Sequence, residues 1–112
     1  SLQFMLGEFV REKVLNLTDE EVPHSVTCVA THIKDKGSIV DVYVDIIIDR
    51  DSLKKIIIGS GGAMLKKIGS MARKDMEELL GKQVYLELYV KTIKNWRDKE
   101  RYLSELGFKD FE

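Results

Sequence analysis

Three glycines in four residues, Gly59, Gly61 and Gly62, form the segment of this sequence with the clearest capacity for chemistry. A simple turn between two helices needs one glycine at most, and additional glycines permit unusual backbone angles and the close approach of another backbone. A helix is expected to begin directly after Gly62, so its unpaired N–H groups and the positive end of its dipole point at the loop. This combination is typical of a binding site for a phosphate group.

Charge is unevenly distributed around this loop. The 112 residues carry a net charge of −1, but residues 1–50 hold five basic and nine acidic side chains, and residues 51–112 hold thirteen and ten. Residues 52–74 hold six basic side chains and no acidic one. A basic segment around a phosphate-binding loop indicates a polyanion as the partner, although a solvated helix surface has the same composition.

Glycine spacing distinguishes between the possible phosphate ligands. The Walker A pattern fits no register here, and the dinucleotide fingerprint requires a glycine where Met64 stands and a strand where this sequence predicts a helix. The segment from Ile58 to Leu65 instead places an apolar residue on each side of a Gly-x-x-Gly loop. A GxxG loop between two helices resembles the KH domain, whose loop holds a few nucleotides of single-stranded nucleic acid.

Other residues that could do chemistry have simpler explanations. Asp41, Asp45 and Asp49 lie four residues apart on a predicted strand, about 13 Å per step, too far to share one cation, so a solvated face is expected. Cys28 is expected to be a core thiol, and a single cysteine excludes an internal disulfide and favours a reducing compartment. With only two histidines, a zinc site built from Cys and His is disfavoured. No acid–base pair or nucleophile constellation is visible, so no catalytic residue and no metal ligand are predicted.

Aromatic residues offer a further candidate surface. Tyr43, Tyr85 and Tyr89 are expected on the outward faces of strands, where bases could stack. Packing against the N-terminal helix or against another domain is the favoured interpretation. Trp96 is expected to anchor a last short helix over residues 98–107.

The elements that must position the loop follow from hydrophobic periodicity. Helical spacing predicts a first helix over residues 6–17, a short helix capped by Asp51 and ending at Gly59, and a long helix from the glycine loop to Gly81. The long helix is predicted to bury the stripe Leu65, Ile68, Ala72, Met76 and Leu79. Alternation of apolar and polar residues predicts strands over 26–34, 39–49 and 83–91.

These elements favour an α+β fold in one domain. The two-helix crossover between the second and third strands allows parallel pairing, so a three-stranded mixed sheet with helices packed on one face is predicted. A composition of 44% hydrophobic and 33% charged residues is that of a globular chain with one core. No apolar run approaches the ~18 residues that a membrane helix needs.

The resemblance to KH domains extends over nearly the whole chain. From about residue 7 to the end, the chain resembles the C-terminal, type II KH domain of the Era GTPase family. The matching segments are residues 8–15, 21–26, 68–77 and 84–91, together with Trp96. The resemblance implies a leader over residues 1–7 from a missing N-terminal GTPase domain and a type II KH domain over residues 8–112.

The resemblance also implies a function. In this family the KH domain binds the unpaired 3′ tail of small-subunit, 16S-type ribosomal RNA during ribosome assembly. The implied partners are therefore single-stranded RNA, the small ribosomal subunit, the protein's own GTPase domain and the membrane periphery, and the implied location is the cytoplasm. RNA-binding residues are expected at Ile58, Gly59, Ser60, Gly61, Gly62, Leu65, Lys66, Lys67, Ile68, Arg73 and Lys74. The pair inside the loop, often including lysine in this family, is Ser60-Gly61 here.

The implied chemistry is recognition without catalysis. The residues present hold no cofactor by this interpretation, because GTP and Mg²⁺ would belong to the missing domain, and this fragment is not expected to be an enzyme. A KH-like fold used mainly for protein–protein contact remains the alternative. A small enzyme is disfavoured because the sequence lacks a catalytic constellation.

Overall fold

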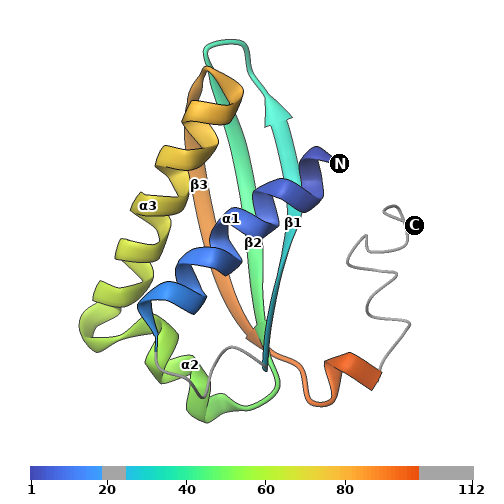
Figure 1. Ribbon diagram of the computed structural model, residues 1–112, viewed down its shortest axis with the longest axis vertical. Coiled ribbons are helices and arrows are strands. Elements are labelled where there is room, and N and C mark those ends of the chain that lie inside the picture. The colour runs from blue at the N-terminus through green and yellow to red at the C-terminus, as the bar shows by residue number, and fades with distance from the viewer. Residues whose placement is uncertain (19–24, 99–112) are drawn as a thin grey trace.

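The computed structural model describes residues 1–18 and 25–98 (Figure 1). In chain order the elements are α1 (Leu2–Leu17), β1 (Val26–Asp35), β2 (Ile39–Ile48), α2 (Asp51–Ile58), the short helical turn η2 (Ser60–Gly62), α3 (Ala63–Leu80), β3 (Gln83–Thr92) and the short helical turn η3 (Trp96–Asp98). The helix expected over residues 98–107 lies outside the described residues, as does most of the loop around Pro23 and His24.

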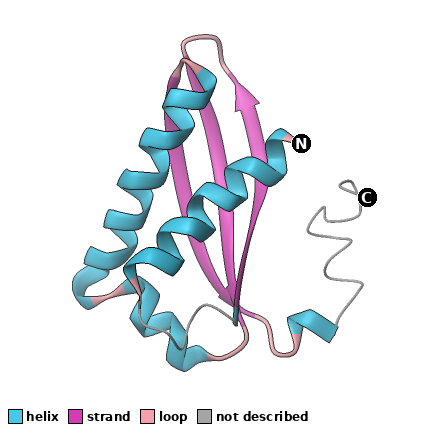
Figure 2. Ribbon diagram, viewed as in Figure 1, coloured by secondary structure: helices cyan, strands magenta, loops and turns pink. Residues whose placement is uncertain are grey.

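The three strands form one mixed sheet in the order β1-β2-β3. β1 pairs antiparallel with β2, with a bulge between Ala30 and His32, and β2 pairs parallel with β3. Figure 2 shows α1 and α3 side by side on one face of this sheet, in agreement with the contacts between them. The predicted α+β class, the mixed sheet and the one-sided helical layer are therefore confirmed.

Helix α1 packs directly onto β1. Leu6, Val10 and Val14, which follow one another at steps of four residues, are completely buried. Gly7 lies on the same side of the helix, and a Cβ atom at this position would lie 2.7 Å from the carbonyl oxygen of Cys28. Only glycine therefore lets α1 approach β1 this closely. Burial raises the pKa of the Cys28 thiol, which keeps it protonated and unreactive in the core, as predicted.

The start of α1 differs from the sequence prediction. The helix begins at Leu2, and the Ser1 hydroxyl accepts a hydrogen bond from the Phe4 amide at 3.2 Å, as a helix cap does. Residues 2–5, which precede the helix expected from the sequence, thus form the first turn of α1.

Helix α3 buries its predicted stripe only in part, and the first residue of the stripe, Leu65, is half-buried against the core. Ile68, Ala72 and Met76 are completely buried, whereas Leu79 is 44% exposed. Leu80, four residues after Met76, is half-buried against the core in its place. After Met76, the residue that faces the core is therefore four positions farther on, at Leu80, and not three positions farther on, at Leu79. Helical periodicity allows either spacing.

Two acidic residues on the sheet face opposite the helices are buried, so the expectation of a solvated face is wrong for them. Asp41 and Asp45 are only 8% and 4% exposed. Each carboxylate pairs with a lysine at 2.7 Å, Asp41 with Lys36 and Asp45 with Lys91. The long lysine side chains shield the carboxylates from water, which a strand pattern alone does not reveal. The buried Ile47 shares this face.

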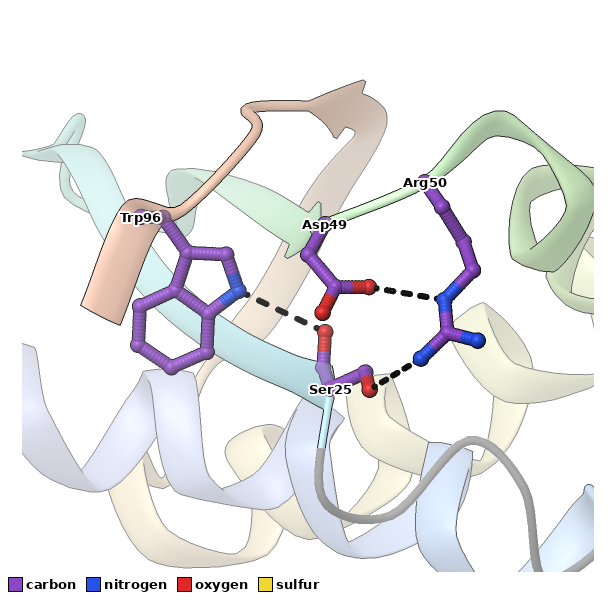
Figure 3. Close-up of polar contacts among 4 residues, drawn as sticks. All are labelled: Ser25, Asp49, Arg50 and Trp96. Carbon is purple, nitrogen blue, oxygen red and sulfur yellow. Dashed lines mark hydrogen bonds and ion pairs between the residues drawn. The ribbon is translucent and has the colours of Figure 1, made fainter. Parts of the chain in front are cut away.

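A polar junction fixes the start of α2 (Figure 3). Arg50 donates to the Asp49 carboxylate at 3.1 Å and to the Ser25 hydroxyl at 3.3 Å. The Trp96 indole N–H donates to the Ser25 carbonyl at 3.4 Å, which ties the chain after β3 to the start of β1. Arg50 occupies the N-cap position, and Asp51, predicted as the cap, is the first helical residue. Its carboxylate lies in the first turn, where it stabilises the positive end of α2.

Candidate nucleic-acid interface

The glycine loop uses each of its three glycines for a backbone conformation that other residues adopt poorly. Gly59 ends α2 with φ +74°, and Gly61 and Gly62 follow with φ +61° and +80°. Gly59 also meets a second constraint, because a Cβ there would lie 2.7 Å from the Cβ of Met64. At Gly61 and Gly62 a Cβ would meet nothing within 4 Å, so the outer side of the loop faces open space.

The first turn of α3 is left open toward the loop. Gly62 is its N-cap residue, no side chain caps it, and its first turn contains no acidic residue. No side-chain cap and no acidic residue of the first turn therefore offset the partial positive charge of this helix end, although the Ala63 amide donates to the Ser60 carbonyl. Ser60, Gly61 and Lys66 are exposed around it. This end of the loop favours an anion such as a phosphate group.

Directly beside the loop, a groove runs between α3 and β3. A cavity of about 570 Å³ lies here, and it is lined by Gly62, Leu65, Lys66, Gly69, Ser70, Arg73, Val84, Tyr85, Leu86 and Leu88. The lining residues of α3 recur every three or four positions, so they form one stripe that faces β3. Gly69 and Ser70 are small, which leaves the groove open between the two elements.

A second cavity continues the groove along the C-terminal half of α3 to the turn before β3. It has a volume of about 600 Å³ and shares Arg73, Val84 and Tyr85 with the first. Its other lining residues are Ile39, Glu77, Gly81, Lys82 and Gln83. Because the two cavities share residues, they form one groove along β3, with Arg73 on the helix side of the junction.

Strand β3 presents a free backbone edge to this groove. It pairs only with β2 in the described sheet, so alternate residues direct their N–H and C=O groups away from the sheet. The amide of Val84 is one of these outward groups, since it donates to the Glu77 carboxylate of α3 at 2.9 Å. The outward set therefore includes Leu86 and Leu88, which line the groove. Apolar side chains beside backbone donors and acceptors suit the edge of a nucleobase.

Glu77 stabilises this edge where β3 begins. We expect Glu77→Ala to lower the free energy of unfolding by about 1–3 kcal/mol, because it leaves the amide of the buried Val84 without a partner. Glu77→Gln retains an oxygen acceptor and should lose less than about 1 kcal/mol. Urea denaturation of both variants and wild type measures the difference. Equal losses in the two variants would show that the charge of Glu77, and not its hydrogen bond, stabilises the fold.

The sequence-predicted RNA-binding residues divide into three groups. Gly62, Leu65, Lys66 and Arg73 line the groove, and the other loop residues adjoin it. Ile68 is completely buried, so it supports α3 from the core. The third group lies outside the groove lining and has half-buried or exposed side chains; it consists of Ile58, Lys67 and Lys74.

Sequence reasoning missed the wall formed by β3. The alternating pattern of β3 assigns Val84, Leu86 and Leu88 to ordinary core positions. The same pattern would be found in a central strand, so it does not indicate that β3 is an edge strand. Gly69 and Ser70 carried a usable signal, because they continue the helical stripe of Leu65 and contribute no bulk. Small residues on a stripe that approaches a strand indicate a groove or a close contact.

Tyrosines of β3 share one carboxylate on the sheet face opposite the helices. The hydroxyls of Tyr85 and Tyr89 both donate to Glu87. These bonds lower the pKa of Glu87, and the bond to Glu87 raises the pKa of Tyr89 to about 12. Tyr43 meets Tyr89 edge to face at 6.3 Å and stacks on His32 at 4.4 Å between ring centres. Helix α1 packs on the other face of the sheet, so the expected packing of the tyrosines against that helix is wrong.

Comparison with known proteins places this loop and groove in a defined class. The chain matches the KH domain family over residues 21–97, which is more than half of its length, and it therefore belongs to that family. The matched residues include the GxxG loop, which is characteristic of this family.

Within this class the chain is similar to the KH domain of Era. It is 41% identical, with a TM-score of 0.89, to Era in a crystal structure with MgGDPNP and nucleotides 1506–1542 of 16S ribosomal RNA. It is also 41% identical, with a TM-score of 0.88, to a variant of Aquifex aeolicus Era bound to GDP and AlF4−. Both matches confirm the type II KH fold and the predicted resemblance. They cover 96% of this chain but 37% of each Era chain, so the GTPase domain of Era lies outside them.

Two further features concern residues 1–18 and 25–98. No helix among them combines the length and apolar character needed to cross a bilayer. Within the same ranges, no three or more His, Cys, Asp or Glu side chains lie together as a metal site requires.

Proposed function

We propose that this chain binds single-stranded RNA in the groove between α3 and β3, with the glycine loop holding the phosphate backbone. The observation that carries the proposal is the continuity of an uncapped helix end, an exposed GxxG loop and a groove that ends at a free strand edge. The similarity to Era crystallised with 16S ribosomal RNA supports the 3′ tail of small-subunit ribosomal RNA as the ligand.

Each part of the groove has a separate task in this proposal. Phosphate groups pass the loop at Ser60 and Gly61, near the positive end of α3, and Lys66 and Arg73 add positive charge farther along the helix. Bases enter the groove, where Leu65 and Leu86 provide apolar contact and the β3 edge provides hydrogen bonds. Paired bases cannot enter, because an A-form duplex keeps their edges inside the helix.

The larger protein is part of the same proposal. We infer that this domain follows a GTPase domain, which holds GTP and Mg²⁺, and that the whole protein acts on the small ribosomal subunit during its assembly. It would work in the cytoplasm, in contact with its own GTPase domain and at the membrane periphery. In that protein the present chain supplies recognition, and the nucleotide chemistry belongs to the GTPase domain.

A binding titration with matched RNAs tests this function. Fluorescently labelled single strands with the sequence of a small-subunit ribosomal RNA 3′ tail should bind at least tenfold more tightly than the same sequence annealed to its complement. A scrambled single strand of equal composition reports how far the sequence matters. Equal affinity for single strand and duplex would indicate non-specific electrostatics. No binding to any RNA by a folded domain would instead favour the alternative role in protein contact.

A further inference from the structure

Tyr85 occupies the rim of the groove at the point where its two cavities meet. It lines both of them, and it lies on the outermost strand of the described sheet with 48% of its surface exposed. Its side chain belongs to the sheet face opposite the helices, whereas the groove opens between β3 and α3. A base that is directed from the groove across the β3 edge therefore meets this ring.

The ring of Tyr85 is held in place before any ligand arrives. Its hydroxyl donates to Glu87 at 2.7 Å, two residues farther along the same strand and on the same face. This hydrogen bond raises the pKa of Tyr85, so the ring stays uncharged at neutral pH. A side chain that is already ordered loses little conformational entropy on binding, which favours its use as a contact surface.

The charges around the ring distinguish a base from a phosphate. Glu87 carries a negative charge beside Tyr85, which disfavours a phosphate on this side of β3. In the first cavity the positive charges lie on the helix side, at Lys66 and Arg73. In the second cavity, Lys82 adds a positive charge in the turn before β3, while the Glu77 carboxylate of α3 is bonded to the Val84 amide. The backbone of a bound strand is therefore expected along α3, with its bases directed toward β3. The flat, uncharged ring matches the face of a base, which stacks on aromatic side chains.

We propose that Tyr85 stacks a nucleobase of the bound single strand where the strand passes from the first cavity to the second. This inference rests on the RNA-binding function proposed above and adds a base-binding position outside the GxxG loop.

Tyr89 supplies a matched control on the same strand. It shares the sheet face with Tyr85, is 44% exposed and also donates to Glu87. It lines neither of the two groove cavities. Removal of Tyr89 thus tests the general effect of losing an exposed tyrosine near Glu87, without removing a ring from the groove.

The test compares Tyr85→Ala, Tyr85→Phe and Tyr89→Ala in titrations with the single-stranded RNA used above. Tyr85→Ala should weaken binding by about 5- to 150-fold, the range for the loss of one aromatic–base stack. Tyr85→Phe keeps the ring and should stay within about threefold of wild type, and Tyr89→Ala should be unchanged. The salt dependence of Tyr85→Ala should equal that of wild type, because stacking releases no counterions.

An RNA series with one abasic nucleotide then locates the stacked base. In wild type, one abasic position should cost as much affinity as Tyr85→Ala does, and in Tyr85→Ala the same position should cost nothing further. If Tyr85→Ala binds like wild type, or if Tyr89→Ala loses as much, the stacking role is wrong while RNA binding by the groove stands. Failure of wild type to bind any RNA overturns the proposed function itself, and the stacking role with it.

Discussion

Ser60→Asp combined with Gly61→Asp is expected to reduce RNA affinity by about 100-fold, since charge-assisted hydrogen bonds contribute roughly 1.5–3 kcal/mol each. Both residues are exposed on the loop beside the uncapped start of α3. Two carboxylates there neutralise the positive helix end and repel the phosphate groups that the loop is proposed to hold. The measurement is a titration with the single-stranded 3′-tail RNA.

The matched control is Ser60→Asn combined with Gly61→Asn. Asparagine has nearly the shape of aspartate, and both residues tolerate the positive φ of +61° at Gly61 better than most side chains. The two double variants should therefore have similar melting temperatures and differ only in charge. If the Asp pair binds RNA as tightly as the Asn pair, phosphate groups do not pass over this loop.

Gly7→Ala is expected to have the largest effect on stability, a loss of about 3 kcal/mol. The added methyl group would lie 2.7 Å from the carbonyl oxygen of Cys28, and the obstacle is backbone, which cannot rotate away. Helix α1 would have to move off β1 and expose part of the core formed by Leu6 and Val10. For a domain of this size the melting temperature should fall by roughly 10–20 °C.

Gly69→Ala is the control for the same substitution in the other long helix. Its Cβ would meet only the Leu88 side chain, at an ordinary distance of 3.5 Å. Replacing a helical glycine by alanine should then stabilise the domain by about 0.5–1 kcal/mol. Thermal melts of both variants give the comparison. A Gly7→Ala protein as stable as wild type would mean that α1 does not rest on the β1 backbone.

Particular elements show what could be predicted from the sequence. Alternation in β2 correctly predicts a strand and the burial of its helix-covered face, from Val40 to Ile48, because a covered face recurs with a period of two residues. The glycine loop is recognisable because three positive φ angles demand glycine at three positions. Helical spacing alone places Lys66, Ser70 and Arg73 on a shared stripe of α3, because they follow one another at steps of four and three residues.

What could not be predicted depends on neighbours that are distant in the sequence. The burial of Asp41 and Asp45 requires Lys36 and Lys91, and the pairing of Asp45 with Lys91 joins two strands that only the fold brings together. Likewise, the closeness of Gly7 to Cys28 and the free edge of β3 follow from packing and strand order. The residue pattern within a single helix or strand contains no information on packing between elements or on strand order.

The parallel pairing of β2 with β3 has a consequence for how the domain folds. β1 and β2 join through a short turn, in which the Lys36 amide donates to the Ile39 carbonyl at 2.9 Å, so this hairpin forms from local contacts. Every β2–β3 pair instead joins residues 44 positions apart, as Val40 and Val84 do. Closing so long a loop carries an entropic cost, so β3 should dock after the hairpin. The groove needs β3 as its second wall, and a nascent chain that stops short of this strand therefore exposes the GxxG loop without a place for the bases.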